Sequence, residues 1–312
     1  MSAAPSVAAI NDLLPRLFPL GPRYAVERVA EGVSTFVYRL TDGDQSCYLR
    51  VLPEAGSTFA PEVRVHGLLR ERGVLGPEIL CYEPYVESLG LSVTVTTTIP
   101  GQSIARQGLG PASPAILAAA GRDLALINSV AVAGFGWLDR RSLHPGILTA
   151  AHSSDRAFRT EYFERDLVLL GAELFGRAEI AALRAIVVRY GSWLEIERAH
   201  LAHGDFDLTH IFVHEGHYSG IIDFGEIRGT DPWYDLGHFA LRDGERSAAP
   251  LLPALLVGYR SVTPLPLDAE ARIAFSSLLI GLRLLARSVE KRSSANADRS
   301  ALRAVRRGLA VL

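Results

Sequence analysis

Two carboxylates and a histidine occur in an order that suits phosphoryl transfer. Residues 203–210 have the sequence HGDFDLTH, and residues 221–225 have the sequence IIDFG. Asp205 lies in the first segment, His210 follows five residues later, and Asp223 lies in the second segment. Transfer of a phosphoryl group from a nucleotide needs one carboxylate to orient the attacking hydroxyl and two ligands to hold Mg²⁺. The spacing therefore predicts Asp205 as the catalytic residue and His210 and Asp223 as magnesium ligands.

His210 is the unusual member of this set. Kinase catalytic loops of the form H-x-D-x-x-x-x-N carry asparagine at the last position. A neutral imidazole can coordinate Mg²⁺, although carboxylate, carbonyl and water oxygens suit this ion better. The alternative is that His210 only forms hydrogen bonds within the loop. If His210 is a ligand, we expect activity to fall in acid, because a protonated imidazole cannot bind a cation.

Three segments together resemble a known family. HGDFDLTH at 203–210, IIDFGE at 221–226 and DPWYDL at 231–236 resemble, in letters, order and intervals, the aminoglycoside phosphotransferase and choline kinase-like family of the protein kinase-like superfamily. The resemblance extends more weakly over the whole chain. It implies that His203 supports the loop by bonding the backbone near Asp223. It also implies that Asp235 ties the loop together from the start of a helix.

Arg50 departs from the kinase plan in the N-terminal part of the chain. A lysine on the third strand of that plan contacts the nucleotide phosphates and pairs with a helix glutamate. Here residues 47–51 are CYLRV, and Lys291 is the only lysine in the chain. Arginine can bind phosphate through two nitrogens. We therefore expect Arg50 to bind nucleotide and to pair with Glu62; the alternative is a surface arginine on an edge strand.

The predicted nucleotide loop is short of glycines. Residues 30–35 have the sequence AEGVST, with one glycine in place of G-x-G-x-x-G. In the fold that the resemblance implies, Gly32 and Ser34 would offer backbone and hydroxyl groups to the phosphates. The adenine would lie beside Thr98 and Ile99, where hinge backbone groups would pair with its edge.

Acidic and aromatic residues near these motifs are candidates for binding the acceptor. Carboxylates suit cationic acceptors, and aromatic rings suit sugars and cations. The candidates are Asp207, Glu226, Asp231 and Trp233, and, in 155–166, Asp155, Glu161 and Glu164. Only Asp207 and Glu226 have a positional argument, because they lie next to the catalytic segments.

The elements that must position these residues divide into two groups. Alternating apolar residues predict strands at 23–31, 33–41, 46–52, 78–83 and 91–99, with one helix at about 60–72. Helical patterns follow at 112–131, 158–176, 178–197, 248–260, 268–292 and 297–310. Residues 201–225 predict a loop, a strand, a turn and a strand. We expect a bilobal, protein kinase-like α+β fold, with a small β-rich nucleotide-binding lobe at 1–99 and a larger, mainly helical catalytic and acceptor-binding lobe at 100–312.

Composition restricts the class of protein. The 312 residues are 48% hydrophobic and 21% charged, and only two are cysteine, which favours a globular protein of a reducing compartment. No apolar run approaches a membrane span and the N-terminus lacks signal-peptide features, so we expect a cytoplasmic protein. Two basic stripes, one of Arg283, Arg287 and Lys291 and one of Arg299, Arg303 and Arg307, predict solvated helix faces, so we expect no nucleic-acid or membrane partner. The oligomeric state is left open.

These patterns predict a Mg²⁺-dependent phosphotransferase that moves the γ-phosphate of ATP or GTP to a hydroxyl of a small molecule. Acidic residues outnumber basic ones between residues 100 and 245, which suits a cationic acceptor. The resemblance favours an aminoglycoside-type antibiotic, giving resistance by modification. The alternatives are a metabolic kinase acting on choline, an amino alcohol or a sugar, and a non-catalytic nucleotide-binding pseudokinase. A protein kinase is disfavoured, because no A-P-E motif follows Asp223.

Overall fold

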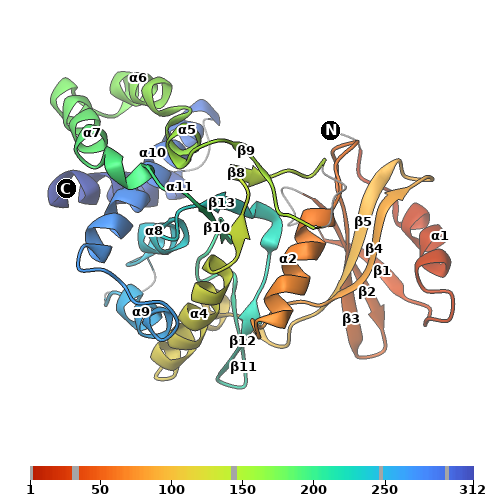
Figure 1. Ribbon diagram of the computed structural model, residues 1–312. Helices are drawn as coiled ribbons and strands as arrows, with labels where there is room; N and C mark the ends of the chain where they lie inside the picture. Colours follow the sequence, from red (N-terminus) through yellow and green to blue (C-terminus); the bar gives the residue numbers. More distant parts are fainter. Residues whose placement is uncertain (1–2, 30–34, 142–145, 246–248, 292–294) are drawn as a thin grey trace.

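The protein has two lobes lying side by side (Figure 1). The computed structural model describes residues 3–29, 35–141, 146–245, 249–291 and 295–312. The N-terminal lobe is built around one antiparallel sheet, and the C-terminal lobe is built mainly of helices. This arrangement confirms the predicted bilobal α+β fold.

The sheet of the N-terminal lobe has five strands in the order β1-β2-β3-β5-β4. All of its pairings are antiparallel. Side chains alternate between the two faces of a strand, so Arg50 points away from the face that buries Leu49 and Val51. The strands are β1 (Ala25–Val29), β2 (Phe36–Asp42), β3 (Gln45–Val51), β4 (Ile79–Val86) and β5 (Leu91–Thr97).

Two helices cover this sheet, one on each side (Figure 1). Helix α2 (Ala60–Glu71) lies on the side of the C-terminal lobe and carries the buried Glu62. Helix α1 (Val7–Leu17) packs on the outer face and was not predicted. Its signal was present: Ser6 caps the helix at Ala9 N, and four buried residues recur at helical spacing, Ile10, Leu13, Leu14 and Leu17.

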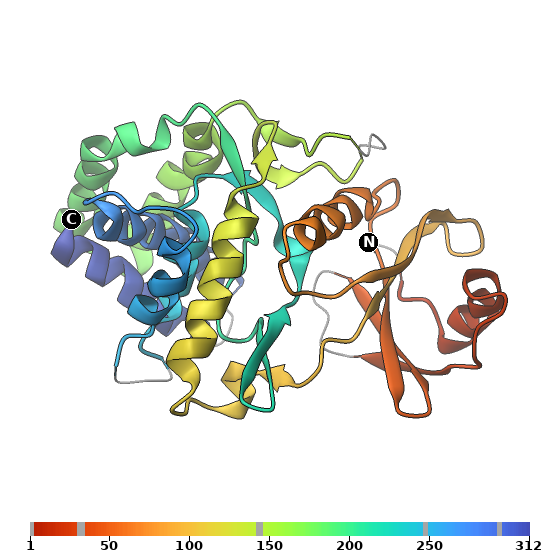
Figure 2. The same cartoon turned by 60° about the horizontal axis from the view of Figure 1, so that its bottom comes forward.

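The chain passes from the five-stranded sheet to the helical lobe between β5 and β6 (Gln102–Ser103). Strand β5 ends at Thr97, and β6 already pairs with the C-terminal lobe. It joins the hairpin of β11 (Ile211–His214) and β12 (His217–Ile221) in a sheet of order β12-β11-β6. Figure 2 shows this hairpin beside helix α4 (Ser113–Asn128). The hairpin connects the loop of Asp205 to Asp223.

A second, discontinuous sheet of order β7-β10-β13-β8-β9 lies in the C-terminal lobe. Its members were not predicted, and the start of the segment predicted as a loop at 201 lies in β10; strands this short do not establish an alternating pattern. It places β10, which precedes the loop of Asp205, between β7 and β13. The strands are β7 (Ala131–Val132), β8 (Phe135–Leu138), β9 (Ala150–His152), β10 (Ala199–Ala202) and β13 (Arg228–Thr230).

The predicted helices of the C-terminal lobe are present in order, but α3 (Ile104–Gln107) and α8 (Tyr234–Arg242) lie outside the predicted ranges, and two predicted helices differ in extent. The helix predicted at 158–176 is two helices, with a break at Glu161 and Tyr162, and the helix predicted at 178–197 ends at Arg189. The remaining helices are α5 (Asp155–Thr160), α6 (Phe163–Glu173), α7 (Arg177–Arg189), α9 (Leu252–Arg260), α10 (Ala269–Lys291) and α11 (Ala295–Val311); the short 3-10 helices are η1 (Gly191–Leu194) and η2 (Phe224–Glu226).

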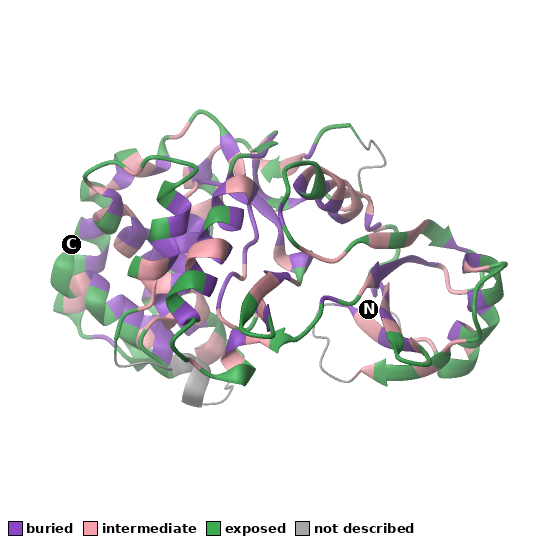
Figure 3. Cartoon of the chain, turned by 90° about the horizontal axis from the view of Figure 1, so that it is seen from below, coloured by how far each residue is buried: buried purple, intermediate pink, exposed green. Residues whose placement is uncertain are grey.

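The helices of the larger lobe pack closely and form the main hydrophobic core of the molecule. Figure 3 shows its buried residues gathered in the middle of that lobe. Helices α4 and α9 approach so closely that a Cβ on Gly258 would lie 1.6 Å from Ala118 O, so only glycine fits there. Among the described helices, none combines the length and apolarity needed to cross a membrane.

Candidate active site

His203 fixes the backbone of the loop between β10 and β11 through hydrogen bonds. This side chain is fully buried. Its Nε2 lies 2.8 Å from Ile222 O, and its Nδ1 accepts a hydrogen bond from Asp205 N at 3.3 Å. Burial, followed by the nearby His210, lowers the pKa of His203, so the ring is neutral with its proton on Nε2. His203 thus joins the residue before Asp223 to the backbone of Asp205.

Asp235, at the start of α8, accepts hydrogen bonds from the backbone at the beginning of the same loop. Its Oδ2 accepts from His203 N and its Oδ1 from Gly204 N, both at 2.8 Å. Gly204 has a φ of +89°, and a Cβ there would lie 2.0 Å from Glu226 O. Any other residue would therefore clash with the backbone that follows Asp223.

The side chain of Asp205 faces a residue that sequence reasoning missed. Asp205 is 40% exposed, and its Oδ1 lies 3.2 Å from Nε2 of the buried His238 on α8. The other ring nitrogen, Nδ1, lies 3.2 Å from Phe206 O. Burial lowers the pKa of His238, and a neutral imidazole has one N–H, so His238 donates to one of these acceptors at a time. The signal was its position three residues after Asp235, on the same face of one helix.

His210 and Asp223 face each other across the mouth of this loop. His210 Nδ1 lies 2.6 Å from Asp205 O, which leaves the Nε2 lone pair directed outward. Nε2 lies 3.8 Å from Asp223 Oδ2. Asp223 has the left-handed φ of 65°, a conformation that costs energy in a residue with a side chain and is found at functional sites. A carboxylate and a free imidazole nitrogen at this separation fit a shared Mg²⁺.

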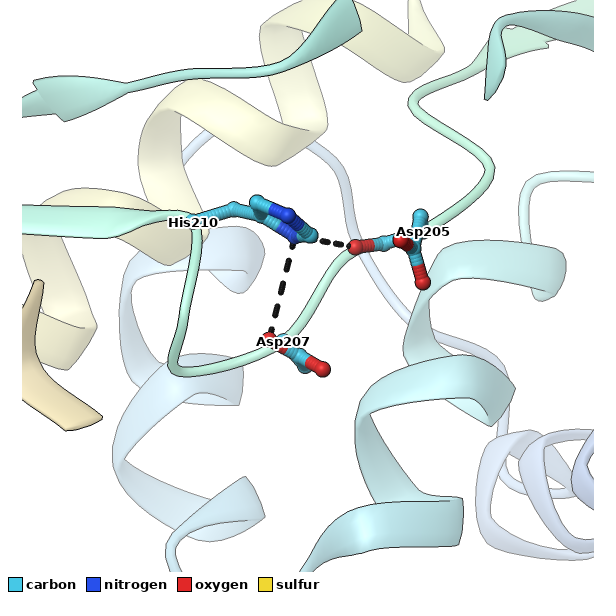
Figure 4. Close-up of side chains that lie close together, drawn as sticks. All are labelled: Asp205, Asp207 and His210. Atoms are coloured by element: carbon cyan, nitrogen blue, oxygen red, sulfur yellow. Dashed lines mark hydrogen bonds and ion pairs between the residues drawn. The ribbon is translucent and has the colours of Figure 1, made fainter. Parts of the chain in front are cut away.

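Asp207 lies beside the other ring nitrogen of His210, with its Oδ1 3.7 Å from His210 Nδ1 (Figure 4). Asp205, Asp207 and His210 form a cluster of potential metal-binding atoms. However, Asp207 Oδ1 accepts from Thr209 N at 2.7 Å, and its Oδ2 lies 3.1 Å from Arg242 Nε. These contacts satisfy the carboxylate within the protein. Of the two ring nitrogens of His210, Nε2 is the one that faces Asp223.

The structure brings Arg50 and Glu62 together between the lobes. Arg50 Nη1 pairs with Glu62 Oε1, and its guanidinium lies 5.2 Å from the centre of the Phe59 ring. Glu62 Oε2 is buried and has no hydrogen-bond partner among the described residues. Arg140, which sequence reasoning missed, lies 4.0 Å from it and donates to Gly225 O at 2.7 Å. An arginine of the large lobe thus connects this ion pair to the turn of Asp223.

The other predicted nucleotide contacts are only partly described. Thr98 is exposed and donates to Ser46 O at 2.7 Å. Ile99 is buried beside β12, close to Gly220. Gly32 and Ser34 lie outside the described residues. The roles of these four residues stay predictions.

The predicted acceptor residues do not gather in one place. Glu226 lies with Asp205 in the lining of a cavity of about 590 Å³. Asp231 is buried and accepts from Arg159 Nη1 at 2.9 Å, and neither Asp231, Asp207 nor Trp233 lines that cavity. Of the three further acids, Glu161 lines it, Asp155 is fully buried, and Glu164 pairs with Arg184 outside it.

The comparison with protein families decides what kind of protein this is. The profile of the phosphotransferase enzyme family (APH) matches residues 25–274. The chain belongs to this family. The match spans both lobes, including β3 with Arg50, the loop of Asp205 and Asp223.

Solved structures of this fold cover nearly the whole chain. Aminoglycoside phosphotransferase APH(4)-Ia is 18% identical, with a TM-score of 0.67 over 96% of this chain and 99% of that chain. A putative aminoglycoside phosphotransferase from Ralstonia eutropha is 18% identical, with a TM-score of 0.68 over 97% and 96%. A putative fructosamine-3-kinase from Thermobifida fusca is 18% identical, with a TM-score of 0.62 over 96% and 100%. No curated protein matches the sequence. These likenesses establish the kinase-like fold.

Proposed function

We propose that this phosphotransferase is a Mg²⁺-dependent kinase that transfers the γ-phosphate of ATP or GTP to a hydroxyl group of a small molecule. The observation that carries the proposal is the catalytic loop. It directs the half-exposed carboxylate of Asp205 into a large cavity and sets His210 Nε2 opposite Asp223 Oδ2 at 3.8 Å. A base and a cation site on one short loop are what phosphoryl transfer needs.

Each residue has a defined task in this reaction. Asp205 orients the acceptor hydroxyl toward the phosphate and accepts its proton late in the transfer. His238 orients the Asp205 carboxylate through the contact of 3.2 Å between His238 Nε2 and Asp205 Oδ1. Arg50, held by Glu62, neutralises phosphate charge. Asp223 and His210 would hold Mg²⁺, which neutralises the phosphate oxygens when it is bound.

Ligand complexes of a protein with the same fold support a nucleotide co-substrate. One structure of APH(4)-Ia is described as a ternary complex with ADP and hygromycin B, and another as a complex with AMP-PNP and hygromycin B. We propose the same type of co-substrate here. An aminoglycoside acceptor, and with it a role in resistance, stays a prediction, because at 17% identity the likeness carries the fold alone. The cytoplasmic location also stays a prediction.

The function is tested by nucleotide turnover with a panel of hydroxyl compounds. We expect Mg²⁺-dependent formation of ADP or GDP that requires an acceptor. Asp205→Asn should reduce turnover by about 10²-fold or more, in the range of one general-base contribution, while nucleotide affinity is retained. The non-catalytic alternative is correct if wild type and Asp205→Asn both bind nucleotide and are equally inert with every acceptor.

A further inference from the structure

The cavity beside Asp205 shows what kind of acceptor the site can hold; the inference rests on the proposed function. Its volume of about 590 Å³ is in the range of pockets that bind drug-sized ligands. Its walls come from β8, from α5 and α6, and from α8 and α10. The carboxylate of Asp205 lies in this wall, so the cavity is the space available to the acceptor.

The charges that line the cavity cancel. Four arginines and four carboxylates are present: Arg159, Arg228, Arg283, Arg287, Glu161, Asp166, Asp205 and Glu226. Arg228 Nη2 lies 3.2 Å from Glu226 Oε2, and Arg283 Nη1 lies 2.9 Å from Asp166 Oδ1. Among the described lining residues, only Asp205 and Glu161 are carboxylates without an arginine partner.

The two carboxylates that pair with arginine, Asp166 and Glu226, are not free to bind a cationic ligand. Burial raises the pKa of Asp166 even though Arg283 and Arg165 lower it, and burial also raises the pKa of Glu226. An amine of the acceptor would have to displace an arginine to reach either of them. Each charge of a polycation that leaves water needs a carboxylate partner, and the described part of this lining leaves only Asp205 and Glu161 without an arginine.

Exposed aromatic rings occupy the same walls. Trp137 is 45% exposed and Tyr162 is 38% exposed. Each is held by a stacked guanidinium: Arg228 lies 3.8 Å from the Trp137 ring centre, and Arg283 lies 4.2 Å from that of Tyr162. When a ligand covers large rings that are fixed in a cavity and open to solvent, apolar surface is removed from water, and this favours binding. Apolar side chains continue the surface: Phe158, Phe163, Leu279, Ile280, Leu282 and Leu284.

We propose that the acceptor is a hydroxyl compound with an extended apolar or aromatic face and at most one amine, and that it is not a polycation. Its apolar face covers Trp137 and Tyr162, and its hydroxyl reaches Asp205. This departs from the cationic acceptor that the acidic residues of the middle of the chain predicted. Only four of those acidic residues line the cavity, and two of the four, Asp166 and Glu226, are paired with arginine.

The test measures acceptor binding apart from catalysis. Full-length Asp205→Asn protein with Mg²⁺ and ADP is titrated with three probes: an aryl glucoside, a macrolide with one dimethylamino group, and the polycation neomycin. We expect the low-charge probes to bind more tightly, with an affinity that changes less than about twofold between low and high salt, because uncharged contacts are not screened. Trp137→Ala should weaken their binding by about tenfold, equivalent to about 1.4 kcal/mol. Tyr85→Ala, which removes an exposed ring on β4, is the matched control and should have no effect.

The outcomes separate this inference from the proposed function. Tightest binding of neomycin, weakened by salt and by Glu161→Gln, overturns the inference, as does a protein that binds neither low-charge probe. Phosphate transfer to neomycin alone leaves the kinase function standing and the inference wrong. Binding of a low-charge probe whose hydroxyl the wild type does not phosphorylate supports the inference and counts against the kinase function.

Discussion

Arg50 and His210 differ from the lysine and asparagine that are usual at these positions in kinases, but each can take over the interactions of the residue it replaces. Arg50 forms the ion pair with Glu62 that a lysine would form. His210 uses Nδ1 within the loop and presents Nε2 to Asp223. Each replacement therefore keeps a charge or a lone pair at the position where the phosphates and the cation are expected, and neither indicates an inactive protein.

The role of His210 is tested by the Mg²⁺ requirement. His210→Ala should raise the Mg²⁺ concentration for half-maximal turnover by about tenfold, because one ligand is lost. His210→Asn should restore most of it, since an amide oxygen is a suitable ligand and the amide can still bond the loop. The control is His214→Ala, which changes an exposed histidine on β11. A wild-type Mg²⁺ requirement in His210→Ala would mean that His210 only supports the loop.

The residues that sequence reasoning missed lie outside the motifs. Asp205, His210 and Asp223 are marked by spacing within one continuous segment. Arg140 precedes Asp223 by more than eighty residues, and it meets Glu62 and Gly225 only because the lobes pack together. His238 could have been found from helical spacing to Asp235. For Arg140 the chain contains no local signal.

At the scale of elements, the length of a helix or strand determines whether it could be predicted from the sequence. Helix α10 (Ala269–Lys291) agrees closely with the prediction at 268–292, because an apolar stripe repeats along it. The strands β6 and β7 have two residues each and depend on pairing with distant strands. The break between α5 and α6 at Tyr162 also lacks a proline or glycine. At this break Tyr162 lies with its ring centre 4.2 Å from the Arg283 guanidinium, a contact between segments that no local pattern announces.

The contact between α5 and β13 predicts a pH-dependent stability. Asp155 is fully buried, its Oδ1 accepts from Thr230 Oγ1 at 2.7 Å, and Asp231 lies close by. Burial, followed by the charge of Asp231, raises the pKa of Asp155 to about 7. An acid with a raised pKa keeps a proton in the folded state that the unfolded state has lost. The free energy of unfolding therefore falls as pH rises from about 4 to about 7.

Asp155→Asn should remove this dependence. The amide is neutral at every pH and can still bond Thr230 and Asp231, so the variant should be more stable than wild type near pH 8, on the order of 1.4 kcal/mol per pKa unit of difference. Denaturant unfolding at several pH values between about pH 5 and pH 8 measures it. Asp44→Asn, in an exposed turn, is the control. A variant with the wild-type pH profile would show that Asp155 is ionised in the folded protein.

At the scale of the whole molecule, a few polar contacts join the two lobes. Asp123 on α4 accepts from Leu75 N in the small lobe and from Tyr218 OH on β12, both at 2.9 Å. On the other side of the cleft, Arg140 O accepts from Thr58 N at 2.7 Å. The first contact fixes the hinge near β12. The second places the Arg140 guanidinium between Glu62 and the turn of Asp223, where it can transmit a movement of one lobe to the other.

Arg140 and Glu62 should therefore act together in nucleotide binding. A small closure of the lobes would bring Arg140 Nη2, now 4.0 Å from Glu62 Oε2, into contact with an oxygen that has no hydrogen-bond partner in the described part of the chain. Arg140→Gln and Glu62→Gln should each weaken Mg²⁺-nucleotide binding measured by calorimetry, and the double variant should lose less than the sum, with a coupling of about 0.5 kcal/mol or more. Arg141→Gln, at the exposed neighbour, should bind as wild type. Additive losses would mean that Arg140 supports the turn of Asp223 alone, and the lobes would then close without this link.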